Sequence, residues 1–266
     1  MPKSSKFATL HNANRVWAVA SIHGEAQRLR AVHEQIAERF EPGDRLVYLG
    51  NFLGHGKEIC ETLDQLLSFR RALLSSPGGL ACDVVFLRGA QEEMWAKLIQ
   101  IHLALNPGEV LEWMFERGLR ATLEAYGGNA SHGLVGARDG AVELARWTGE
   151  MRDAMQSHPG HSRLMSALRQ AAFTEDGSLL FVNAGIEAAR PLDTQGDSLW
   201  WGDGFDKITE PYNGFKMIVR GYDRKKRGVR ITAHTASLDG GCGDGGGPLQ
   251  AACFDMSGAC IEQIEG

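Results

Sequence analysis

The sequence has no uninterrupted apolar run of the roughly 18 residues that a membrane-spanning helix needs. Its first 14 residues also lack the apolar segment of a secretory signal peptide. The five cysteines are odd in number, scattered along the chain, and never spaced as Cys-x-x-Cys. These absences argue against a membrane protein and against a disulfide framework. They predict free thiols and a cytoplasmic location.

An excess of basic residues, internal repeats, low-complexity tracts and a linker are also missing. The 266 residues carry a net charge of -5, with 43% hydrophobic and 23% charged residues. This composition predicts one large globular domain, and the acidic balance makes nucleic acid and membranes unexpected partners. The five basic residues within positions 224–230 favour a solvated turn between strands over a nucleic-acid-binding patch.

The first hundred residues alternate between strand and helix patterns. Residues 16–20, 45–49 and 84–87 are short apolar segments, and apolar residues at helical spacing follow them, the third helix covering about 92–105. Such alternation predicts parallel strands whose following loops share one edge of the sheet. Residues 106–172 are predicted to be helical. Further strands are predicted at 179–182, 216–220, 229–233 and 249–254.

Polar, glycine-containing loops follow these strands. The first three read ASIHG (20–24), GNFLGHG (50–56) and RGAQE (88–92). Two later strands end at FVNAG (181–185) and VRGY (219–222). The glycine-rich GGCGDGGG (240–247) lacks the Lys-Ser/Thr pair of a phosphate-binding loop, so a tight turn between strands is favoured there.

In these loops the chain resembles the calcineurin-like metallophosphoesterases, especially the bacterial branch allied to serine/threonine protein phosphatases and diadenosine tetraphosphatases. That family carries Gly-Asp-x-His-Gly, Gly-Asp-x-x-Asp-Arg-Gly, Gly-Asn-His-Glu, and strands ending in His-Ala-Gly and Gly-His. The resemblance covers roughly residues 14–256 in the family's order. It implies a single domain over 1–266 with a mixed α/β fold. This fold is a β-sandwich of two mixed sheets flanked by helices, with a helical insert at about 106–172 and two metal ions at the strand ends.

At the positions where the family has metal ligands, this chain mostly has residues that bind metal ions poorly. These positions are Ser21, His23, Asn51, Ala90, Asn183 and Tyr222. Only His23 is a strong ligand for a transition metal, and no carboxylate offsets the charge of two cations. Gly54 replaces the aspartate that orients the catalytic histidine, and His55 replaces a phosphate-binding arginine. Gln91 replaces the histidine that protonates the leaving group and does not titrate, so the resemblance implies impaired catalysis.

Several of these residues also suit purely structural roles. His23 is favoured as a hydrogen-bonded loop residue over a metal ligand. Glu92, which the family also has, suits the positive end of a helix dipole. Asn51 and Asn183 could bond loop backbones, and Tyr222 could fill the volume of a lost metal. His234 lies one strand beyond the Gly-His position, so it is not counted as a ligand.

The leading hypothesis is a cytoplasmic pseudophosphatase, catalytically impaired, that binds a protein partner or a phosphorylated ligand and needs no cofactor. The ligand-binding candidates are His23, Asn51, His55, Arg88, Glu92 and Asn183. Backbone N–H groups of the strand-end loops and helix N-termini are expected to attract an oxyanion, with positive charge added by His55 and by Arg88 or Arg220. The alternative is an active phosphoester hydrolase, for phosphoproteins or nucleotides. Its altered site around His23 and Glu92 would hold a divalent metal such as Mn, Fe, Zn or Ni. The sequence does not determine the oligomeric state.

Overall fold

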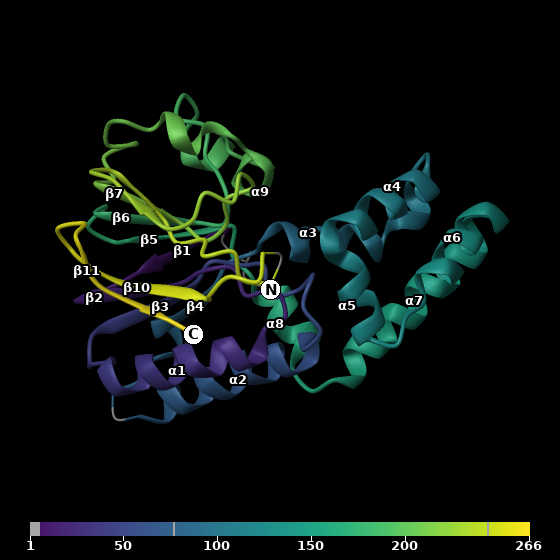
Figure 1. The fold of residues 1–266 in the computed structure, drawn as a ribbon, viewed down its shortest axis with the longest axis horizontal. Coiled ribbons are helices and arrows are strands. Elements are labelled where there is room, and N and C mark those ends of the chain that lie inside the picture. The colour runs from purple at the N-terminus through teal and green to yellow at the C-terminus, as the bar shows by residue number, and fades with distance from the viewer. Residues whose placement is uncertain (1–5, 77, 244) are drawn as a thin grey trace.

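The structure is a computed structural model that describes residues 6–76, 78–243 and 245–266. Figure 1 shows two stacked sheets, with helices α1 (Ala26–Arg39) and α2 (Ile59–Ser75) on the outer face of one of them. A group of further helices extends to one side of the stack. This arrangement confirms the predicted mixed α/β fold of two mixed sheets flanked by helices.

The five-stranded sheet carries the strand–helix alternation read from the sequence. Its order is β11-β10-β2-β3-β4, and the β2–β3 and β3–β4 pairs are parallel, as predicted. The bounds are Arg15–Val19 (β2), Asp44–Tyr48 (β3), Val84–Phe86 (β4), Gln250–Asp255 (β10) and Cys260–Glu265 (β11). The loops after β2, β3 and β4 therefore leave the same edge of the sheet.

The six-stranded sheet has the order β1-β5-β6-β7-β9-β8, with β6, β7 and β9 parallel. Its bounds are Phe7–Leu10 (β1), Ala171–Thr174 (β5), Leu179–Val182 (β6), Met217–Arg220 (β7), Arg230–Ile231 (β8) and Thr235–Ser237 (β9). The sequence did not reveal β1, β5, β9 or β11. The helical prediction ran into β5, and the strand predicted at 229–233 is only two residues long. These strands are too short or too polar for periodicity to show, and pairing with neighbours stabilises them.

The predicted helical segment at 106–172 is confirmed over most of its length. After α3 (Ala90–Leu98) come η2 (Ile101–Leu103), α4 (Pro107–Met114), η3 (Phe115–Leu119), α5 (Arg120–Ala125), α6 (Ala130–Asp139), α7 (Ala141–Ser157) and α8 (His161–Ala167). The helical axis kinks at Gly118, whose φ of 98° suits glycine. The short elements η1 (Ala81–Asp83), η4 (Leu192–Thr194), α9 (Ser198–Trp201) and η5 (Gly204–Lys207) complete the chain.

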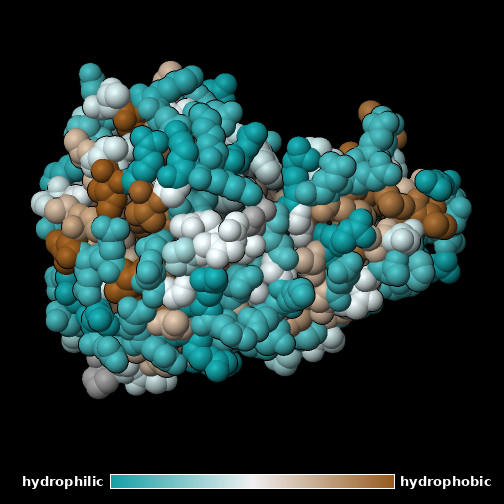
Figure 2. All heavy atoms as spheres, in the orientation of Figure 1, coloured by the Kyte–Doolittle hydropathy of each residue, from teal (hydrophilic) through white to brown (hydrophobic). Residues whose placement is uncertain are grey.

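The core lies between the two sheets and beneath α1 and α2. Strands β2 and β3 are buried almost throughout, because both faces of their sheet are covered. The surface in Figure 2 is mostly hydrophilic, with apolar side chains gathered on parts of the sheets and the helical region. Over the described ranges, no helix is both long and apolar enough to cross a membrane.

Candidate functional site

The loops after β2, β3, β4 and β7 meet around one cavity of about 350 Å³. From these loops the cavity takes His23, Asn51, His55, Ala90, Gln91 and Tyr222. The sequence placed the first three loops at one sheet edge, and the structure brings their residues together with Tyr222, which follows β7 of the other sheet. Ser21, Asn183 and Glu92 lie behind this wall and do not line the cavity.

Three side chains on this wall sit on backbone that such residues rarely adopt. His23, Asn51 and His55 have φ values of 53°, 56° and 57°. Left-handed backbone is uncommon outside glycine, and strained residues tend to cluster at functional sites. The loops therefore hold three neutral or weakly basic side chains in backbone conformations that are uncommon outside glycine.

Two asparagines occupy positions that the resemblance assigns to metal ligands, and both form hydrogen bonds within the protein. Asn51 Nδ2 donates to Ser21 Oγ (3.1 Å), and Asn51 Oδ1 accepts from the Gln91 N–H (3.1 Å). Asn183 Nδ2 donates to the Leu49 carbonyl (2.7 Å), and its Oδ1 accepts from the Ala90 N–H (3.3 Å). Both amide oxygens thus cap the first turn of α3, where unpaired N–H groups need partners.

Glu92 is fully occupied by backbone donors. Its Oε2 accepts from the N–H groups of Asn51 (2.8 Å) and Gly89 (2.7 Å), and its Oε1 from those of Phe52 (2.7 Å) and Leu53 (3.1 Å). Burial raises the pKa of Glu92, while the four N–H groups act in the opposite direction. The four hydrogen bonds of Glu92 therefore hold the loop after β3 against the start of α3.

Gln91 and His55 connect the loops after β4 and β3 to the helical kink at Gly118. Gln91 Nε2 donates to the Arg117 carbonyl (2.7 Å) and lies 3.4 Å from His55 Nε2. The His55 N–H donates to the Gly118 carbonyl (3.2 Å). A Cβ at Gly54 would stand 2.3 Å from Gln91 Cδ, so glycine at this position leaves room for the glutamine. Gly54, which replaces the family's aspartate, therefore leaves space for Gln91, which replaces its histidine.

Tyr222 lines the cavity and lies against His23. Their rings are 5.7 Å apart and nearly perpendicular, and the His23 and His55 rings are 4.9 Å apart. His23 Nδ1 lies 3.2 Å from the Leu53 carbonyl oxygen. His234 precedes β9 and its Nδ1 contacts the Lys216 carbonyl, so it takes no part in this cavity.

The outer wall of the cavity was not found from the sequence. It consists of Trp113, Glu116 and Arg117 from the helical region, with Trp201 and Arg224 from the other side. The two tryptophan rings are 5.8 Å apart, and the Arg117 guanidinium lies 4.3 Å over the Trp113 ring. No sequence pattern marks these residues, because only the folding of distant segments brings them to the loops.

Several of the loop N–H groups expected to attract an oxyanion donate to acceptors within the protein. The N–H groups of Ile22 and His23 donate to the Asn51 carbonyl, that of Gly54 donates to Thr122 Oγ1, and that of Tyr222 donates to the Asn183 carbonyl. Because the protein satisfies these donors itself, an anion beside them would have to be held by side chains.

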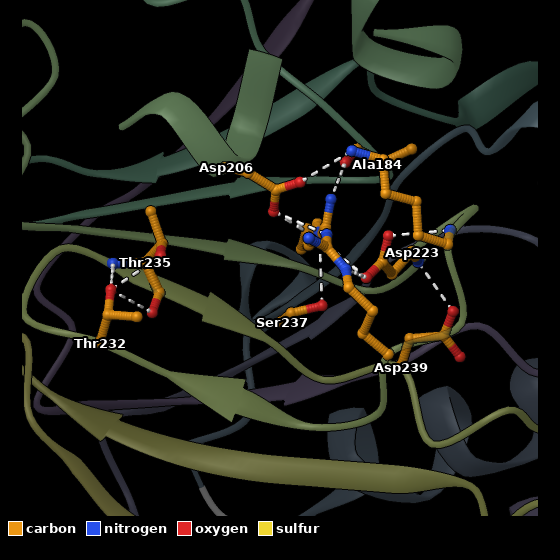
Figure 3. Close-up of polar contacts among 10 residues, drawn as sticks. Ala184, Asp206, Asp223, Thr232, Thr235, Ser237 and Asp239 are labelled. Carbon is orange, nitrogen blue, oxygen red and sulfur yellow. Dashed lines mark hydrogen bonds and ion pairs between the residues drawn. The ribbon is translucent and has the colours of Figure 1, made fainter. Parts of the chain in front are cut away.

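The two arginines expected to help do not line the cavity. Arg88 pairs with Glu93 at 3.0 Å. Arg220 Nε donates to Ser237 Oγ (3.0 Å), and its guanidinium pairs with Asp223 (2.9 Å). Figure 3 shows Ser237 and Asp223 within this group of polar contacts.

The basic segment at 224–230 belongs to the same charged network. Arg227 pairs with Asp206 (2.6 Å) and Asp223 (2.7 Å), and Lys225 pairs with Asp206 (3.4 Å). The Arg227 side chain lowers the pKa of the Asp206 carboxyl below its ordinary value. These charges neutralise one another, which supports the interpretation as a surface turn.

The six residues that the resemblance assigns to metal-binding positions do not fit two divalent cations. They offer one hydroxyl, one imidazole, one phenol, a methyl group, and two amides whose oxygens already accept from peptide N–H groups. Mn, Fe and Zn centres of this charge need carboxylate or several imidazole ligands. These residues therefore lack the carboxylates that offset the charge of a two-metal site.

Neither a family model nor a curated protein matches the sequence. Solved structures match with a TM-score of 0.5 or more. A candidate diadenosine tetraphosphatase has a TM-score of 0.59 and 18% identity, with 98% of each chain covered. A serine/threonine phosphatase from Saccharomyces cerevisiae, similar to human PP5, has 0.55 and 11%, covering 99% of this chain and 84% of that one.

A cold-active protein-tyrosine phosphatase of a Shewanella species has a TM-score of 0.52 and 13% identity, covering 98% of this chain and 82% of that one. At these identities the similarity establishes the fold alone. The chain has the calcineurin-like metallophosphoesterase fold.

Proposed function

We propose that this chain is a pseudophosphatase, which has the metallophosphoesterase fold without phosphoester hydrolysis and binds a ligand in the remaining cavity. One observation carries the proposal: Asn51 and Asn183, at two metal positions, use their amide oxygens to bond the start of α3. Each of these oxygens already accepts one bond that caps the helix, and a neutral amide oxygen is a poor bridge between two cations. Neither asparagine therefore supplies the negative charge that a pair of divalent ions needs.

The other steps of metal-assisted hydrolysis lack residues as well. Without metal ions no bound water is acidified towards neutral pH. Gln91 cannot protonate a leaving group, and its amide is bonded to the Arg117 carbonyl. Because these losses affect one mechanism, together they are expected to lower turnover by several orders of magnitude.

The walls of the cavity favour a phosphorylated ligand. A cavity of about 350 Å³ is within the range that small molecules occupy. Arg117, Arg224 and His55 offer donors for an anionic group, and Trp113 and Trp201 offer apolar faces. This mixture suits a small phosphorylated molecule with a ring better than it suits a flat protein surface.

Hydrolysis of p-nitrophenyl phosphate, a phosphopeptide and a dinucleoside polyphosphate is expected at the rate of the buffer alone. Mn²⁺, Mg²⁺, Ni²⁺ and Zn²⁺ are each added in turn, because no donor set remains for a two-metal site. The matched control is His23→Ala, which removes the remaining imidazole ligand. Metal-dependent turnover that His23→Ala abolishes would contradict the proposal and favour a hydrolase with an altered site.

Binding of phosphate and of nucleotides is expected at millimolar concentration by isothermal titration calorimetry. Arg117→Gln should weaken it several-fold, since one charge-assisted hydrogen bond is lost. Arg152→Gln, an exposed arginine on α7, serves as the control and should leave the affinity unchanged. Absence of heat with all these ligands would remove the phosphorylated-ligand part of the proposal while leaving the loss of hydrolysis intact.

A further inference from the structure

A second group of metal-ligating side chains lies outside the cavity. Over the described part of the chain, one set of three comes together: Cys60, His158 and His161, whose ligand atoms all lie within 4.8 Å of one another. Cys60 is in the first turn of α2, His158 caps the C-terminus of α7, and His161 begins α8. Two distant segments therefore contribute one thiol and two imidazoles to the same spot.

His161 is held by both of its ring nitrogens. Its side chain is fully buried, Nε2 lies 3.2 Å from Asp64 Oδ1, and Nδ1 lies 2.7 Å from the Tyr126 hydroxyl. The His158 ring stacks on it at 5.0 Å. Metal-binding histidines commonly have an oxygen partner on the second nitrogen, which orients the ring. The Tyr126 hydroxyl holds Nδ1 in this way, which leaves Nε2, on the Asp64 side, as the ligating atom.

We propose that Cys60, His158 and His161 bind one Zn²⁺ ion that fastens the turn between α7 and α8 to α2. A thiolate with two imidazoles is a donor set that zinc takes in proteins. Zinc bonds of about 2.0 to 2.3 Å place tetrahedral ligand atoms about 3.3 to 3.6 Å apart, so the side chains close by about 1 Å. Asp64, one turn after Cys60, offers a carboxylate for the fourth position.

The proton balance of this step is simple. Zinc takes cysteine as a thiolate. When the zinc–sulfur bond forms, the S–H bond breaks and the proton goes to solvent. Zinc affinity should therefore increase with pH.

The position of this group suggests a structural role for the ion. Figure 1 shows α8 beside α2, at the base of the helices that extend from the sheets. Those helices carry Trp113 and Arg117 to the cavity wall. An ion at the base would fix their position relative to α2. This inference does not depend on the proposed loss of hydrolysis.

The test starts from full-length protein kept reduced, stripped with a chelator and then dialysed against Zn²⁺. Plasma mass spectrometry is expected to find one zinc per chain, with a higher Tm than the stripped protein. Cys60→Ser and His158→Gln should each lose this zinc, and both sites are half-buried, so folding is checked by circular dichroism. Cys242→Ser, which changes a buried thiol bonded to the Ile22 carbonyl, and His23→Ala, which changes the other cavity, should retain it.

Cobalt gives a second readout that names the ligand. Co²⁺ bound by a thiolate shows a sulfur-to-metal charge-transfer band in the near ultraviolet. This band should be present in the wild type and in Cys242→Ser, and absent in Cys60→Ser. Folded wild-type protein without zinc, or a full zinc equivalent retained by both Cys60→Ser and His158→Gln, would overturn the proposal.

Discussion

Glu92→Gln is expected to destabilise the protein by about 3 kcal/mol, since it leaves buried donors without acceptors. Glu92 is 1% exposed, and each of its carboxylate oxygens accepts from two backbone N–H groups. An amide has one acceptor oxygen, so its NH₂ group would face two N–H donors. For a chain of this length the Tm should fall by about 6 to 12 °C, measured by calorimetry.

Glu61→Gln is the matched control for that prediction. Glu61 is also an acid in the first turn of a helix, α2, but it is exposed. Its removal loses at most the interaction with the helix dipole, which is worth about 0.3 to 1 kcal/mol. Equal effects of the two substitutions would mean that Glu92 acts only through the dipole and that its four hydrogen bonds contribute little.

Asn51→Asp restores a family ligand, and it is expected to lower stability without restoring catalysis. Asn51 is fully buried, its Nδ2 donates to Ser21 Oγ, and its N–H donates to the Glu92 carboxylate. The introduced carboxylate would lack the amide's donor group and would lie near the like charge of Glu92. We expect a loss of about 2 to 4 kcal/mol at pH 7, with turnover still at background.

The destabilisation by Asn51→Asp is expected to depend on pH. Burial should raise the pKa of the introduced carboxyl group, so the folded state binds its proton more tightly than the unfolded state. The stability difference from the wild type should therefore shrink as the pH falls from 7 towards 5, as thermal melts would show. Asn129→Asp is the control, because Asn129 is an exposed N-cap of α6 and aspartate caps helices equally well.

Added Mn²⁺ should not recover the Tm of Asn51→Asp, because the neighbouring positions still offer no carboxylate and one imidazole. A gain of many degrees with Mn²⁺, or metal-dependent turnover, would show that one residue suffices to rebuild the centre. A complete set would also need Gly54→Asp and Gln91→His together. The glycine has a φ of 84° and no room for a Cβ beside Gln91.

The sequence by itself determined the parallel strands β2, β3 and β4 and the edge at which their loops meet. Apolar segments separated by helical periodicity specify such strands locally, and the connection rules then place the loops. The order of the loops also carried the resemblance to metallophosphoesterases, and with it the absence of metal-binding carboxylates at Ser21 and Asn51. These features depend on residues close together in the chain.

Tertiary structure alone decided which groups those loop residues contact. The partners of Glu92, the docking of Gln91 on the kink at Gly118, and the approach of Trp113 to Trp201 all join segments far apart in sequence. The same is true of Cys60 with His158 and His161, whose spacing along the chain gives no sign of a metal site. These hydrogen bonds and metal-ligand sets form between segments that only the packed fold brings together. The periodicity of one segment does not encode how far it lies from another segment.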